Sequence, residues 1–288
     1  MKALISTKVL SAVFAAFFFS AAATAASSFY AVGGGVFLLL CIRYIATLSV
    51  ATAFDKPSIK QKTKSTHVRL IIISILQAVF VASYMYSITL IPLSLAVVVI
   101  YTFPIFTFFA NSIIRSRSID ALSALALFVS LFGIWLMVQG DTTDGDIWGF
   151  FWGLVASVAQ ASVNILSRHE GVKPGWGFVK YIMVLPATVF ALVYFVNTAE
   201  PLASVTTSMI MWSLISAVGM SGGFYFYFHS IAKIGPVRTS NVMFLEPVFT
   251  IMMGIALLHN VLGLTQWLGI LVIILATSSL EFWGKKYS

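Results

Sequence analysis

The sequence predicts an all-α integral membrane protein with ten transmembrane helices, arranged as two inverted five-helix repeats. Three observations support this fold class. Of the 288 residues, 60% are hydrophobic and only 9% are charged, whereas a soluble domain carries roughly 25% charged residues. The basic residues gather in alternate connections between apolar segments, and a short motif recurs at almost half the chain length.

Ten apolar segments are long enough to cross a bilayer, which takes about 20 residues of helix. We place these spans at residues 9–27, 31–52, 69–89, 93–113, 120–140, 147–166, 177–197, 208–230, 239–258 and 264–283. Pro92, Pro201 and Pro236 lie in the short connections that separate them. None of the connections is long enough to hold a soluble domain.

The first span has a second interpretation. Residues Met1 to Ser28 combine a basic start, an apolar stretch and an Ala-rich end, which is also the pattern of a cleaved signal peptide. Removal of this span would leave four helices plus five and would break the repeat symmetry. We therefore expect the first helix to be retained, and cleavage stays the alternative.

The basic residues orient the chain. With the N-terminus inside, 16 of the 17 Lys and Arg fall in inside segments, and the last, Arg43, lies within a span. The outside connections hold acidic residues instead, among them Asp141, Asp144, Asp146 and Glu200. By the positive-inside rule, both termini are predicted to face the cytoplasm.

Several other classes of protein and site are excluded. The formal net charge of +8 is spread between apolar segments rather than along one amphipathic face, so no nucleic-acid partner is expected. The single cysteine, Cys41, cannot build a disulfide framework. The four histidines fall in four separate segments, at His67, His169, His229 and His259. We therefore expect no metal site and no cofactor.

The repeat is visible in one motif. Residues 104–107, Pro-Ile-Phe-Thr, recur as Pro-Val-Phe-Thr at residues 247–250, an offset of 143 residues. This offset divides the chain into repeats at residues 1–142 and 143–288, each with five helices. Because five is odd, the second repeat starts on the opposite side of the membrane. Inverted repeats of this kind usually place a solute site near the midplane, at their interface.

The ninth predicted helix carries the most specific motif, Leu245-Glu246-Pro247 near its start. With Arg43 in the second helix and Pro104 in the fourth, it resembles the drug/metabolite transporter superfamily, in proteins with two EamA-type domains. The resemblance covers essentially the whole chain. It implies solute efflux or exchange across the bacterial inner membrane, and the structurally known relatives that it resembles most are exporters of aromatic and neutral amino acids.

Glu246 is the leading candidate for a functional residue. A carboxylate inside a span costs about 2.5–3.5 kcal/mol on insertion scales, and such residues commonly serve function. Pro247 removes an amide donor and can open the helix next to it. Glu246 is predicted to couple protons or to bind a solute amine. The alternatives place it in water near the inner mouth or in a bond that locks two helices together.

Three other polar residues have two or more interpretations each. Arg43 could bind a solute carboxylate, extend its stem to the lipid headgroups or pair with Glu246. Gln160 and Asn164 are four residues apart and share one helix face. They are candidates for a cavity wall or for hydrogen bonds that hold helices together.

Tyrosines and one further amide complete the candidate site. Gln77 and Tyr84 share a face of the third helix, and Tyr101 and Tyr225 lie in the fourth and eighth helices. Such rings supply apolar contact area with one polar handle each, and packing in the bundle is the alternative. We expect Tyr84, Tyr101 and Glu246 to approach one central cavity.

A transporter is the predicted function, and a membrane-embedded enzyme, a channel or a structural membrane protein are the alternatives. An enzyme would need a second acidic or nucleophilic group at the depth of Glu246, and the apolar helices supply none. A pore would repeat polar residues along a helix face, whereas these helices are mostly apolar. The expected partners are a small-molecule substrate, the lipid bilayer and protons as a coupling ion, with the protein a monomer.

Overall fold

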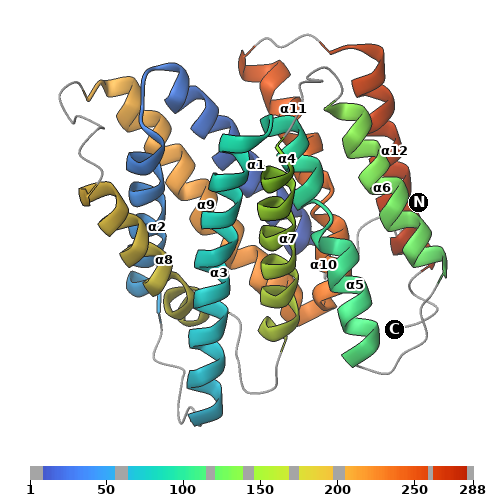
Figure 1. The fold of residues 1–288 in the computed structure, drawn as a ribbon, viewed down its shortest axis with the longest axis horizontal. Helices are drawn as coiled ribbons and strands as arrows, with labels where there is room; N and C mark the ends of the chain where they lie inside the picture. The colour runs from blue at the N-terminus through green and yellow to red at the C-terminus, as the bar shows by residue number, and fades with distance from the viewer. Residues whose placement is uncertain are drawn as a thin grey trace.

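A computed structural model describes residues 9–55, 64–114, 121–138, 146–168, 175–196, 205–258 and 262–283. Within these ranges the regular structure is entirely α-helical, in twelve helices that Figure 1 labels α1 to α12. Their bounds are α1 Leu10–Ala31, α2 Val36–Ala53, α3 Lys64–Leu90, α4 Leu93–Ile100, α5 Phe103–Ile114, α6 Ala121–Met137, α7 Ile147–Ser167, α8 Trp176–Val196, α9 Thr207–Ile234, α10 Pro236–Val242, α11 Leu245–Leu258 and α12 Leu264–Trp283.

These helices account for the ten predicted spans. Eight stretches of the described chain are long and apolar enough to cross a membrane, and two shorter apolar helices lie at Ala121–Met137 and Leu264–Ser279. Two of the eight stretches contain a pair of helices each, α4 with α5 and α10 with α11. The helix ends differ from the predicted span ends by a few residues.

The fourth and ninth predicted spans each contain two short helices. The helix is interrupted at Tyr101–Thr102 in one and at Met243–Phe244 in the other. Each break comes just before the proline of the repeated motif, Pro104 or Pro247. A proline lacks the N–H that would bond back along the helix and crowds the preceding turn, and the chain tightens there into i→i−3 hydrogen bonds. We call these two points the helix breaks.

Helices from the two halves of the chain pair with each other. The main contacts join α1 with α9, α2 with α8, α3 with α7 and α6 with α12. In Figure 1, α2 and α8 lie toward one edge of the bundle and α6 and α12 form the other, with α4, α5, α7, α10 and α11 between them. The core of the protein is therefore made jointly by both halves.

Glycines allow two of these pairs to approach closely. A Cβ on Gly219 of α9 would come within 2.8 Å of the Phe18 carbonyl oxygen of α1. A Cβ on Gly269 of α12 would come within 2.6 Å of the Gly133 carbonyl oxygen of α6. Small residues at helix interfaces let backbones meet in this way. Loss of α1 would remove a helix that is packed along α9 and also against α11.

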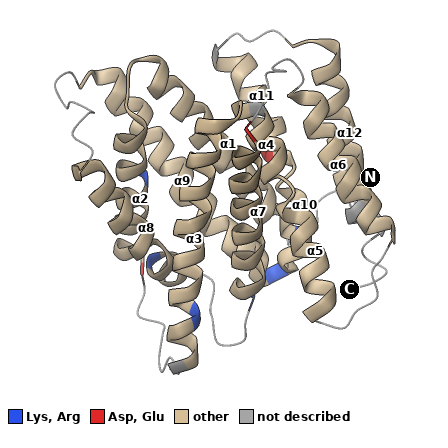
Figure 2. Cartoon of the chain, viewed as in Figure 1, with Lys and Arg blue, Asp and Glu red and all other residues tan. Residues whose placement is uncertain are grey.

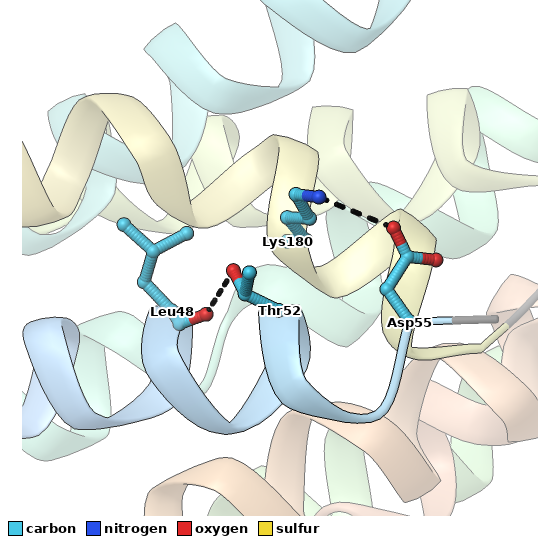
Figure 3. Close-up of polar contacts among 4 residues, drawn as sticks. All are labelled: Leu48, Thr52, Asp55 and Lys180. Carbon is cyan, nitrogen blue, oxygen red and sulfur yellow. Dashed lines mark hydrogen bonds and ion pairs between the residues drawn. The ribbon is translucent and has the colours of Figure 1, made fainter. Parts of the chain in front are cut away.

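Most of the ribbon segments that Figure 2 colours blue for Lys and Arg lie toward one end of the bundle, at the bottom of the view. We call it the basic end and define it by Arg69, Lys180, Lys233 and Arg238. There the Lys180 ammonium lies 3.3 Å from the Asp55 carboxylate, which joins the end of α2 to α8 (Figure 3). In the last turn of α2, the Thr52 hydroxyl donates to the Leu48 carbonyl oxygen at 2.7 Å.

Candidate solute-binding cavity

A cavity of ≈ 170 Å³ lies inside the helix bundle, bordered by α1, α3, α4, α5, α7, α9 and α11. Aromatic rings dominate its wall, and they belong to Phe19, Phe80, Tyr84, Tyr101, Phe103, Phe224 and Tyr227. The polar lining residues are Gln160 and Glu246. An apolar pocket with a few converging polar groups is the usual form of a small-molecule site.

Both helix breaks border this cavity. Tyr101 lies in the break between α4 and α5, and Phe103 follows it; Met243 lies in the break between α10 and α11, and Glu246 follows it closely. Irregular backbone at membrane depth is tolerated where protein buries it or where it lines a cavity. The two breaks therefore set the position of the cavity along the bundle.

Glu246 lies in the first turn of α11. The amide groups at a helix start favour a negative charge, so this position partly compensates the carboxylate for the loss of water. Its backbone carbonyl oxygen accepts from the Ser20 hydroxyl at 2.7 Å and from the Thr250 hydroxyl at 3.0 Å. Its side chain interacts with the Tyr101 side chain, and both residues line the cavity.

Arg43 is half-buried on α2 and does not line the cavity. Its charge is nevertheless within electrostatic range of Tyr84 and Glu246. Among the described residues the ion pair found within 4.0 Å joins Lys180 to Asp55, so Arg43 and Glu246 are near each other without a direct salt bridge. The Arg43 Nε is buried and has no hydrogen-bond partner among the described residues.

Gln160 and Asn164 do share one face of α7, and they do so in different roles. Gln160 lines the cavity, whereas Asn164 is fully buried behind it. The Gln160 Nε2 donates to the Asn164 Oδ1 at 3.1 Å and to the Tyr227 hydroxyl at 3.3 Å. The Tyr227 hydroxyl in turn donates to the Asn164 Oδ1 at 2.6 Å.

Asn164 also bonds away from the cavity. Its Nδ2 donates to the Thr107 hydroxyl of α5 at 3.2 Å and to the Ser240 hydroxyl of α10 at 2.9 Å. One amide group thus holds residues of four helices, α5, α7, α9 and α10.

The structure brings together four of the eight sequence-predicted site residues, namely Tyr84, Tyr101, Gln160 and Glu246. The other four lie outside the lining. Besides Arg43 and Asn164, Gln77 is fully buried beside Tyr44. Tyr225 is stacked on Trp176, with ring centroids 4.6 Å apart, and on His229 at 5.9 Å.

Tyr227 and the lining phenylalanines are cavity residues that the sequence patterns do not single out. Tyr225 and Tyr227 are two residues apart on α9, so they point to nearly opposite sides of a helix with 3.6 residues per turn. Residues 224–228 are all aromatic, and no sequence signal selects which of them faces a cavity. The spacing of Phe224 and Tyr227, three residues apart, fits a shared face only once one of them has been placed.

Comparison with known proteins gives three likenesses. Residues 147–280 match the EamA-like transporter family. The chain is also 22% identical over 190 residues to the "Uncharacterized inner membrane transporter YedA" of Escherichia coli strain K12, and equally to that of Escherichia coli O157:H7. The match covers 65% of this chain and 61% of those relatives, so it spans about three fifths of their length.

A crystal structure of another protein has the same overall fold. It superposes with a TM-score of 0.78 and 15% sequence identity, over 95% of this chain and 96% of that one. At this identity the likeness establishes the fold alone. The matched range includes the motif around Glu246 and Pro247. Residues 147–280, in the second half of the chain, are therefore similar to the EamA-like transporter family.

Proposed function

We propose that this protein is a secondary transporter of the bacterial inner membrane, which exports or exchanges small metabolites by alternating access. The observation that carries the proposal is the cavity at the two helix breaks, where one carboxylate, one amide and seven aromatic rings meet. Amino acids and related solutes are the first class to test. The protein is proposed to act as a monomer with both termini in the cytoplasm.

The helix pairing supports two inverted repeats. If the first five spans correspond in order to the last five, α1 corresponds to α7, α3 to α9, α2 to α8 and α6 to α12. The contact of α1 with α9 then corresponds to that of α7 with α3, which is also a main contact of the bundle. The same relation exchanges α2 with α8 and α6 with α12, so each of these two contacts is unchanged by it.

The helix starts agree with the same relation. The repeated motif has an offset of 143 residues, and this offset also relates the start of α4 at Leu93 to that of α10 at Pro236. It relates the start of α6 at Ala121 to that of α12 at Leu264 as well. Two such halves can rock against each other around a fixed site, which is the usual basis of alternating access.

The lining suits a small solute with an apolar body and an amine. The Glu246 carboxylate offers the amine a charge-assisted hydrogen bond, and the surrounding rings offer apolar contact and cation–π attraction. Arg43 lies outside the cavity lining but within electrostatic range of Glu246 and Tyr84, and its charge would attract a solute carboxylate from that distance. A volume of ≈ 170 Å³ favours solutes smaller than drugs, whose pockets measure about 300–1,000 Å³.

Protons are the proposed coupling ion, with Glu246 as the site of exchange. The first-repeat counterpart of Glu246 is Phe103, because both precede the shared proline. An ionisable group in one half only gives the two access states different chemistry at the cavity. A purely architectural residue would be expected in both halves.

Solute flux in proteoliposomes tests the proposal. Purified protein is reconstituted and screened with radiolabelled amino acids, nucleosides and sugars, with protein-free vesicles as the control. We expect saturable uptake of at least one solute and accelerated exchange when unlabelled solute is loaded inside. Flux that rises linearly with concentration and shows no counterflow would indicate a channel. Flux equal to that of empty vesicles for the whole screen would reject the proposal.

A further inference from the structure

A buried hydrogen-bond network lies between the cavity and the basic end of the bundle. We call it the Asn164 network, and it consists of Thr107, Gln160, Asn164, Tyr227 and Ser240. Thr107, Asn164 and Ser240 have no exposed surface, while Tyr227 and Gln160 are 3% and 8% exposed. Burying five polar side chains in an apolar bundle is energetically unfavourable unless each has hydrogen-bond partners.

Asn164 is fully satisfied in this network. A carboxamide has two donors on its nitrogen and two acceptor positions on its oxygen. The Asn164 oxygen accepts from Gln160 and Tyr227, and its nitrogen donates to Thr107 and Ser240. All four hydrogen-bonding positions of the Asn164 amide are occupied. A change in the hydrogen bonds to its oxygen therefore alters those made by its nitrogen.

The two sides of the amide have different surroundings. Gln160 and Tyr227 line the cavity, so their polar groups are within reach of a bound solute. Thr107 and Ser240 belong to α5 and α10, which pack against each other between the helix breaks and the basic end. Their hydroxyls are anchored in turn, because Thr107 donates to the Phe103 carbonyl oxygen and Ser240 to that of Pro236.

The contact between α5 and α10 differs from its counterpart at the other end of the bundle. Under the repeat relation, α10 corresponds to α4 and α5 to α11. The short helix α10 packs on α5 and α9, whereas α4 makes its main contact with α7 and smaller ones with α3 and α6. The Asn164 network thus lies at the end where the two halves meet around α10.

We propose that Asn164 is a positioning residue that couples occupancy of the cavity to closure of the basic end. A solute that takes a hydrogen bond from Gln160 or Tyr227 removes a partner from the Asn164 oxygen. The amide then reorients, its bonds to Thr107 and Ser240 weaken, and α10 separates from α5. Partly satisfied buried networks are unstable, so the network favours either the fully bonded closed state or an opened one. The inference rests on the proposed function for what the opening achieves, and the network itself does not depend on transport.

Spin-label distances across the basic end test this coupling without any solute. In a Cys41→Ala background, labels are attached at Ile113→Cys near the end of α5 and at Ala232→Cys near the end of α9, both exposed positions. The protein is measured in lipid nanodiscs. Tyr227→Phe removes one hydroxyl on the cavity side, and Ser240→Ala removes one on the α10 side. Ser162→Ala is the control, because it lies on α7 outside the network and bonds only locally to Val158.

We expect Tyr227→Phe to move the distance distribution to longer values, in the same direction as Ser240→Ala, while Ser162→Ala matches the parent. A longer distance with Ser240→Ala but an unchanged distance with Tyr227→Phe would overturn the coupling. It would show that the Ser240 hydrogen bond only holds neighbouring helices together. An unchanged distribution in both would overturn it as well. If Ser240→Ala fails to fold, Thr107→Val keeps the shape of the side chain and takes its place. Because no solute is present, a failed flux screen leaves these outcomes unaffected and rejects only the proposed transport function.

Discussion

At Glu246 the chain places a carboxylate in an apolar span, and the groups around it offset only part of the free-energy cost of removing it from water. The residue begins α11, and its side chain interacts with Tyr101 and with the charge of Arg43. A helix start contributes about 0.3–1 kcal/mol to such a charge, against about 2.5–3.5 kcal/mol for inserting it. The difference is unfavourable, so a structural role alone gives little reason to keep an acid here.

Glu246→Gln separates proton coupling from solute binding. The amide keeps the shape of the side chain and cannot titrate. We therefore expect the variant to insert and to exchange solute, at a higher half-saturating concentration because the solute amine loses its charge-assisted hydrogen bond. We also expect it to lose accumulation driven by a proton gradient, so that solute equilibrates to equal concentrations. The measurement is uptake into proteoliposomes with and without an imposed pH difference.

Glu246→Asp is the control, since it retains an ionisable group and should retain some pH-driven uptake. Accumulation of the Gln variant at the parent level would exclude coupling through this residue. Loss of folded protein would instead point to a structural interaction, and Arg43 is then the first partner to replace.

Half of the predicted site residues reach the cavity, and the reason lies in what each prediction used. Glu246 and Gln160 are polar groups in apolar spans, and Tyr84 and Tyr101 are polar-tipped rings there, so chemistry alone singled them out. Tyr227 stands in a run of aromatic residues, where its selection over Tyr225 depends on which face of α9 meets α1 and α7. That choice is made by neighbours far apart in the sequence.

At the scale of helices, the number and order of spans follow from the apolar runs and the alternating basic connections. The breaks do not follow from these patterns, although their cause is visible. Pro104 and Pro247 belong to the repeated motif, and Pro247 is expected to open the helix next to it. The tightened backbone just before each proline is a local hydrogen-bond effect that hydropathy does not register. The span ranges alone therefore do not show the two helix breaks that border the cavity.

Gly269→Ala should weaken the crossing of α6 and α12. A Cβ at this position would meet the Gly133 carbonyl oxygen at 2.6 Å and the Met137 side chain at 2.6 Å. A backbone oxygen cannot turn aside as a side chain does, so the helices must separate. Overpacking of this kind costs about 1–3 kcal/mol, and we expect a lower melting temperature in detergent.

Gly263→Ala is the matched control for this substitution. Its Cβ would have only the Thr265 hydroxyl nearby, at 3.9 Å, and its stability should match that of the parent. Equal melting temperatures for the two variants would show that the crossing has room that the structure does not indicate.

The pair of Asp55 and Lys180 is expected to contribute little. The two side chains are 17% and 34% exposed, and partly exposed ion pairs are worth about 0–1 kcal/mol. A double-mutant cycle with Asp55→Asn and Lys180→Met should give a coupling energy in that range, and it should fall as salt is added. A coupling above this range that is insensitive to salt would mean that the pair is shielded from water.

For the whole molecule, the one-sided basic residues predict the orientation in the membrane. Reporter fusions after Ser288 and within residues 141–146 should report opposite sides, with the C-terminal fusion active in the cytoplasm. A periplasmic signal from the C-terminal fusion would refute the arrangement of ten spans with both ends inside. A soluble reporter fused after residue 283 serves as a second junction at the same end.

The pairing of helices across the two halves has a consequence for biosynthesis. The helices α1 to α6 leave the ribosome before the helices that complete them exist. Until then, Ser20 has no Glu246 carbonyl oxygen to bond, Ser74 lacks that of Ile182, and Thr47 lacks the Ser221 hydroxyl. The first half must therefore wait in the bilayer as loosely associated helices, and the arrival of the second half is the event that folds both. We therefore expect a nascent chain that stops before α12 to lack the packing partner of α6 and to be less stable than the complete bundle.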